Sequence, residues 1–431
     1  MNKKISLGAA IAAMVIVAAV AVSATMAIAM RRFDSLVSEL SKRQEMYSKF
    51  AEIDNAIRQN YYGTIDEEAL RNALASGYAS GIGDPYAAFL TAEEYSEAQQ
   101  KLSGKSTGFG FEVVRNSAGQ VVISSVMKGS VAYSSGLQKG DVVTALDKNA
   151  LGDDALSVME KALRTATSML LTVHRDDRDV AVELTTAANM SFSLISVESR
   201  MIDTTGYIRI KAFTDVTTEQ FKTAYADLLT QGAESIVLDL RDNAGGSLQS
   251  ACKILDYLLP RGLYAYYTDS SGKQEFRADE TYQIDIPCVT LVNGRTEGEA
   301  ELVAAALHQS KSSMLVGTKT AGRAKVQQYF TIASDNSAVK LTVGELKLLD
   351  DTSWEGSGLQ PDETVTPENT SAAVETLTDA SDMQLQTALR RLSNTTNDPT
   401  TTTTTTAATA DETTTAASDA AETTTTTESA A

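Results

Sequence analysis

The sequence predicts a mixed α/β protein of several domains, preceded by an apolar N-terminal segment. Three observations lead to this prediction: an apolar run at residues 5–30, alternating strand and helix patterns over residues 189–368, and a change to mostly Thr and Ala after Arg391. With 431 residues, the chain is long enough for two or three domains with their own cores. Its contents of 43% hydrophobic and 22% charged residues are ordinary for a globular protein.

Charge and residue counts exclude some functions. The net charge of −19 argues against a nucleic acid as partner, because phosphates need a basic face, and is compatible with an exported protein kept soluble by its charge. The two histidines, His174 and His308, are too few for a metal site with ordinary ligands, so we expect no metal and no cofactor. Cys252 and Cys288 are expected as buried thiols, and a disulfide between them is the alternative.

Residues 1–32 are predicted to form a membrane anchor. Lys3 and Lys4 precede the uncharged run from Ile5 to Met30, and Arg31 and Arg32 close it. About 20 residues suffice for a helix to span a bilayer, whereas a cleaved signal peptide usually has a shorter apolar core. Small residues at positions 27 and 29 leave cleavage, and therefore secretion, as the alternative.

Residues 33–104 are predicted to be helical. Asp66-Glu67-Glu68 would place carboxylates at the positive end of a helix dipole. Asp84-Pro85-Tyr86 interrupts the pattern, and Thr91 to Glu94 has the spacing of a capping box that opens the next helix.

Residues 105–188 alternate short strand patterns with turns and one helix. Gly108-Phe109-Gly110-Phe111 begins a strand, and a Gly-Leu-x-x-Gly-Asp segment follows at 136–141. These two motifs resemble a PDZ domain in kind and order. Glycines let consecutive N–H groups converge on a peptide carboxylate, while the following strand edge accepts the peptide as an added strand. The resemblance implies that residues 108–111 bind peptide or protein C-termini; the alternative is that these glycines only start a strand.

Residues 189–392 are predicted to form an α/β core that ends in a helix. The apolar run Ile236–Leu240 is typical of a buried strand, and Phe221, Tyr225 and Leu228 recur at helical spacing. We expect further strands at 206–210, 289–292, 314–316 and 341–343, and helices at 217–229, 247–259 and 299–308.

Several motifs resemble the C-terminal processing peptidases, tail-specific serine proteases of the S41 type with a PDZ domain and a Ser-Lys dyad. These motifs are the segments 83–95, 238–246, 293–301, 318–327 and 358–362, and the resemblance extends from about Tyr61 to Val365. It implies an exported protein whose body lies outside the cytoplasm. It also implies that Gly245 and Gly246 form the oxyanion turn, where N–H groups face a carbonyl oxygen. The same glycines would also suit a plain turn into a helix.

Both dyad positions are degenerate in this chain. Gly298 stands where the family has its serine nucleophile, and Arg323 stands where it has the lysine base. Gln327 matches the Gln that supports that lysine. Glycine offers no nucleophile, and a guanidinium keeps its proton in proteins, so neither change rescues the other.

Charged residues gather around these positions. An ion pair of Arg323 with Glu297 or Glu299 would neutralise the former catalytic pocket. Glycosidase or metal chemistry is disfavoured, because no His or further acid in register accompanies these carboxylates.

Residues 393–431 are predicted to be a disordered tail. They are mostly Thr and Ala, with six acidic residues and no basic residue, and such a segment cannot bury a core. A glycosylated spacer and an unmodified tail both fit this composition.

The sequence therefore predicts an exported, membrane-anchored relative of these peptidases that does not use a Ser-Lys dyad. Its expected role is to bind peptide segments, as an adaptor for an active protease paralogue. Two alternatives remain: an active peptidase with an unorthodox nucleophile such as Thr296, and a structural envelope protein whose PDZ domain has lost its ligand.

Overall fold

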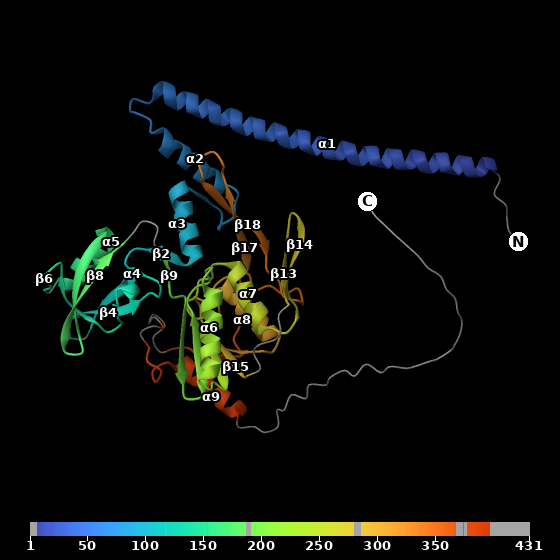
Figure 1. Ribbon diagram of the computed structural model, residues 1–431. Helices are drawn as coiled ribbons and strands as arrows, with labels where there is room; N and C mark the ends of the chain where they lie inside the picture. Colours follow the sequence, from blue (N-terminus) through green and yellow to red (C-terminus); the bar gives the residue numbers. More distant parts are fainter. Residues whose placement is uncertain are drawn as a thin grey trace, which may run out of the picture. The chain divides into compact units, whose positions relative to one another are not determined.

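A computed structural model describes residues 7–116, 118–152, 154–186, 191–279, 286–367, 374 and 377–396. The chain divides into two compact units, Met1–Gly77 and Tyr78–Ala431, which are described separately. In the first unit, α1 is a continuous helix from Leu7 to Asn60 (Figure 1). The guanidinium of Arg58 binds Glu67, at the start of α2 (Glu67–Ser80), at 2.5 Å. The predicted anchor is not confirmed: among the described residues, no helix is both long enough and apolar enough to cross a membrane.

Tyr78 to Leu90 corrects the prediction of a purely helical region. Ala88–Leu90 forms a strand, β1, which pairs antiparallel with β18 (Ala338–Glu345). The Asp84 carboxylate fixes this approach, because it accepts the N–H of Tyr86 at 3.0 Å and that of Thr342 at 3.1 Å. The predicted capping box is confirmed at α3 (Ala92–Ser103).

The next elements form a sheet of order β3-β4-β5-β7-β8 with two helices, α4 and α5. Phe109, Phe111, Met159 and Leu171 lie in its hydrophobic core. Strand β3 is at the edge of the sheet, and α5 packs beside it. The bounds are β2 Lys105–Thr107, β3 Phe111–Arg115, β4 Val121–Val126, α4 Val131–Ser134, β5 Val142–Leu146, β6 Asn149–Ala150, α5 Ala155–Thr165, β7 Ser168–Arg175, β8 Arg178–Thr185 and β9 Ser191–Ser193.

The core is a six-stranded sheet of order β10-β11-β12-β15-β16-β19. All pairs are parallel except β10 with β11. Helices α6, α7 and α8 contribute to the core on one face, and α9 packs on the other (Figure 1). The bounds are β10 Val197–Ile202, β11 Thr205–Ile210, α6 Thr217–Thr230, β12 Ser235–Asp239, α7 Leu248–Leu258, β13 Gly262–Asp269, β14 Gly272–Ala278, β15 Cys288–Val292, α8 Glu299–Gln309, β16 Met314–Gly317, β17 Lys325–Thr331, β19 Glu363–Thr364 and α9 Met383–Thr396.

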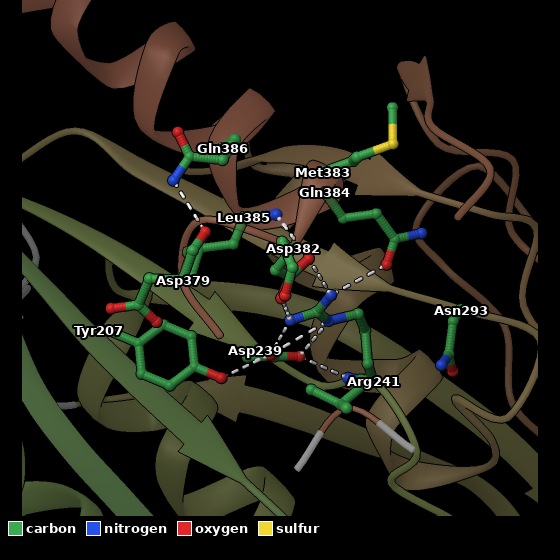
Figure 2. Close-up of polar contacts among 12 residues, drawn as sticks. Tyr207, Asp239, Arg241, Asn293, Asp379, Asp382, Met383, Gln384, Leu385 and Gln386 are labelled. Atoms are coloured by element: carbon green, nitrogen blue, oxygen red, sulfur yellow. Dashed lines mark hydrogen bonds and ion pairs between the residues drawn. The ribbon is translucent and has the colours of Figure 1, made fainter. Parts of the chain in front are cut away.

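A buried ion cluster attaches α9 to this sheet (Figure 2). The guanidinium of Arg241 donates to Asp239 at 2.6 Å, to Asp382 at 2.7 Å and to Gln384 at 3.0 Å. The hydroxyl of Tyr207 donates to the same Asp239 carboxylate at 2.7 Å. Helix α9 continues to Thr396, so the first four residues of the predicted tail are helical; the rest of that tail lies outside the described residues.

Candidate active site

Three chain segments meet at the carboxyl ends of the parallel strands, where open α/β sheets place their sites. They follow β12, β15 and β16, and they contain all the predicted dyad and oxyanion positions. The N–H of Glu297 donates to the carbonyl of Asn243 at 2.9 Å, and that of Ala321 to the carbonyl of Thr296 at 3.1 Å. Three of the motifs that resemble the family, at 238–246, 293–301 and 318–327, therefore lie together.

The buried carboxylate of Glu301 connects two of these three segments, those that follow β15 and β16. It accepts the N–H of Gly298 at 3.1 Å and the N–H groups of Gly322 and Arg323 at 2.8 Å each. The hydroxyl of Thr320 also donates to it. Burial raises the pKa of Glu301, against the lowering effect of these donors. One side chain thus joins the segment of Gly298 to the segment of Arg323.

The backbone at Gly298 has a conformation that L-residues rarely adopt, with φ 58° and ψ −118°. Gly298 is the N-cap of α8, directly after a strand and a tight turn. A Cβ built there would meet nothing within 4 Å. The position is therefore open in space, and a side chain there would strain the backbone, as at the exposed strand-to-helix turns that carry nucleophiles in α/β-hydrolases.

At the predicted base position, the positive charge of Arg323 is balanced by an ion pair. The guanidinium of Arg323 donates to the carboxylate of Glu297 at 2.5 Å, which is one of the two pairings predicted from the sequence. The Arg323 side chain is 53% exposed, so it does not lie in a desolvated pocket. Gln327 is exposed on β17.

Both N–H groups of the predicted oxyanion turn donate to side chains of this chain. The Gly246 N–H donates to a Glu299 carboxylate oxygen at 2.8 Å, and the Gly245 N–H donates to the Asn243 side-chain oxygen at 2.9 Å. Burial raises the pKa of Glu299, and the Gly246 N–H opposes that shift. A substrate carbonyl at this turn would compete with a carboxylate already in place. The sequence did not predict this contact. The signal for it was Glu299 itself, an acidic residue directly after Gly298 at the start of a helix.

Thr296 is unsuited to act as the alternative nucleophile. It is fully buried, its hydroxyl donates to the carbonyl of Leu240 at 2.9 Å, and its oxygen accepts the N–H of Asn293 at 2.9 Å. These contacts make it a structural residue of the turn.

The predicted carboxylate-binding loop begins at the edge strand β3. Gly108 and Gly110 have positive φ angles of 116° and 78°. A Cβ at Gly110 would lie 2.1 Å from the Cβ of Ser130, so only glycine fits there. The carbonyls of Phe109 and Gly110 bind Ala132 and Met127, while their N–H groups donate to no acceptor among the described residues. The loop therefore offers donors beside an open strand edge and α5.

The remaining candidates are structural. Cys252 and Cys288 are free thiols, and burial raises the pKa of each to about 11. His308 binds Asp362 at 2.9 Å on the surface of α8. Among the described residues, no cluster of His, Cys, Asp or Glu could hold a metal ion.

Family models match two parts of this chain. The model for peptidase family S41 matches residues 204–365, and the PDZ domain model matches residues 99–173. The carboxyl-terminal-processing protease of Synechocystis is 30% identical over 322 residues, which cover 72% of this chain and 74% of that protein. The carboxy-terminal processing protease CtpA of Bacillus subtilis is 28% identical over 330 residues, covering 73% and 68% respectively. The solved structure of a putative S41 protease from Bacteroides fragilis has 20% identity and a TM-score of 0.49, and covers 80% of this chain and 97% of that one. The chain therefore belongs to the C-terminal processing protease family, within peptidase family S41.

Proposed function

We propose that this protein binds peptide or protein C-termini and does not hydrolyse them through a Ser-Lys dyad. The main support is the contact between Glu299 and the Gly246 N–H, which adds to the loss of nucleophile and base at Gly298 and Arg323. Three requirements of acyl transfer are then absent together, while Glu301 keeps the frame assembled.

The proposed role is that of an adaptor, which presents captured segments to an active protease paralogue. An extracytoplasmic body, either anchored through residues 1–32 or released by cleavage, is part of this proposal and rests on the sequence alone.

We expect the purified protein to show no peptidase activity above background. Without nucleophile and base, only binding and oxyanion stabilisation remain, and the latter is blocked by Glu299. Fluorophosphonate labelling and casein digestion measure this, with the Bacillus subtilis relative as positive control. Specific cleavage that a folded Thr296→Ala variant lacks would instead favour the unorthodox peptidase.

We expect the PDZ domain to bind peptides that end in a free, apolar residue, and to lose them when the peptide is amidated. The N–H groups of Phe109 and Gly110 are the donors for that carboxylate. A Kd of about 1 μM or weaker is expected, since one added strand buries little area. Fluorescence anisotropy with matched free and amidated peptides measures the difference, and equal affinities would contradict this binding mode.

A further inference from the structure

The turn that follows β15 contains the only Asn-Gly pair in the sequence, Asn293-Gly294. Asparagine loses its side-chain amide most readily before glycine, because glycine has no Cβ to shield the backbone nitrogen that attacks the amide. Gly294 is exposed, and its N–H donates to no acceptor among the described residues. The attacking nitrogen is therefore free and open to water.

The side-chain carbonyl of Asn293 is held in position for this attack. Its Oδ1 accepts the N–H of Arg295, two residues further on, at 3.0 Å. This contact closes an Asx-turn, in which the side chain folds back over the next peptide bond and brings its carbonyl carbon beside the nitrogen of Gly294. Reactants that are already oriented in this way need little further ordering before they react.

Two backbone donors polarise the same carbonyl. Asn293 Oδ1 accepts the N–H of Asp242 at 3.1 Å in addition to the N–H of Arg295. One donor comes from the turn after β12 and the other from the turn after β15. Both donate to the oxygen on which negative charge gathers when the carbon is attacked. This is the chemistry of an oxyanion hole, here applied to a side chain of the protein itself.

We propose that Asn293 is a site of spontaneous deamidation, which this turn promotes. The nitrogen of Gly294 loses its proton to solvent and bonds to Cγ of Asn293, while electrons of the C=O bond move to Oδ1. When the carbonyl re-forms, the Cγ–Nδ2 bond breaks, and the amide nitrogen takes a proton from water and leaves as ammonia. Water then opens the cyclic imide, which leaves aspartate or isoaspartate at position 293.

Deamidation changes a contact that joins two segments of the site. Asn293 Nδ2 donates to Asp242 Oδ1 at 2.6 Å, so the aspartate product sets a second carboxylate against that of Asp242. The isoaspartate product adds an atom to the main chain of the turn. The guanidinium of Arg295 binds Asp242 at 2.7 Å and offsets only part of the repulsion. The link between the segments after β12 and β15 therefore weakens as the protein ages, whether or not the protein has the binding function proposed above.

Peptide mapping by mass spectrometry tests the site in the full chain, incubated in detergent at mildly alkaline pH. We expect the replacement of –NH2 by –OH at Asn293 to be at least about tenfold faster than at Asn336. Asn336 is the internal control, because it is exposed in a turn but the N–H of the following Ser337 donates to Asp335 at 3.0 Å. Equal rates at the two asparagines, or no modification of Asn293, would overturn the proposal.

Two comparisons show whether the turn promotes the reaction. Asn293 should react at least as fast in the native protein as in the same protein unfolded in guanidinium chloride, because its carbonyl is oriented and polarised only in the folded chain. A slower reaction in the native protein would show that the fold protects Asn293, and the proposal would be wrong. Gly294→Ala should fold, since its Cβ would meet only the carbonyl of Lys319, at 3.7 Å, and it should slow the reaction. An unchanged rate in this variant would exclude attack by this nitrogen.

The Asn293→Asp variant measures the consequence for the fold. It carries one of the two products, so it should lower the midpoint of thermal unfolding by about 2–4 °C. Asn336→Asp makes the same charge change at an exposed side chain and should leave the midpoint unchanged. Equal midpoints for the two variants would contradict the weakened link between Asn293 and Asp242.

Discussion

Replacing Arg241 by alanine is expected to lower the free energy of unfolding by about 3–5 kcal/mol. Removal of one partner from a buried ion cluster leaves the others charged and desolvated, which is what makes such changes costly. Arg241 is 1% exposed, and Asp239 and Asp382 around it are also buried. Urea unfolding followed by circular dichroism measures the loss, and α9 should detach first because Asp382 precedes it.

Two controls separate this effect from a simple loss of charge. Arg277 forms an exposed ion pair with Glu275 at 2.8 Å, and Arg277→Ala should cost less than about 1 kcal/mol. Changing Arg241 to Met together with Asp239→Asn and Asp382→Asn removes all three charges and should recover part of the stability. Equal losses for Arg241→Ala and Arg277→Ala would show that the cluster does not hold α9.

Restoring the dyad should produce peptidase activity in two steps. Gly298→Ser with Arg323→Lys supplies the nucleophile and the base, but we expect only weak cleavage. Glu297 would keep the new lysine protonated, and Glu299 would still occupy the Gly246 N–H. Adding Glu297→Ala and Glu299→Ala should raise kcat by about 100-fold or more over the double variant, the usual contribution of one oxyanion donor.

The introduced serine must also accept the backbone conformation of Gly298. With φ at 58°, a side chain there costs about 1–3 kcal/mol. The contacts of Glu301 must therefore keep the backbone in this conformation. A matched quadruple variant that carries Gly298→Ala instead of Gly298→Ser has the same strain and no nucleophile, so it should be inert. If the serine version folds and is also inert, the proposal that Glu301 keeps the segments of the site in a catalytically competent arrangement is wrong.

Much of the core could be predicted from local patterns. The strand at 236–240 and the helix at 217–229 appear within one residue of their predicted bounds, because an apolar run and a helical periodicity are local signals. The capping box at Thr91 is likewise confirmed by both of its hydrogen bonds.

The missed features depend on residues far apart in the chain. Strand β1 has three residues and is defined by its pairing with β18, so its own sequence has no periodicity to detect. Asp382 binds Arg241 across 141 positions. The sequence left open whether Glu297 or Glu299 pairs with Arg323, because the direction of each side chain is set by where α8 begins.

The way in which Glu301 binds has a consequence for how this site can evolve. Three of its four partners are backbone N–H groups, which every residue except proline provides. The identity of residue 323 can therefore change without loss of its contact, whereas Gly322 is restricted to glycine, because a Cβ there would lie 2.7 Å from the backbone nitrogen of Gly358. In this architecture, catalysis can therefore be lost while the shape of the site is kept. A lineage can replace catalysis by a binding role through single substitutions that leave the protein folded at every step.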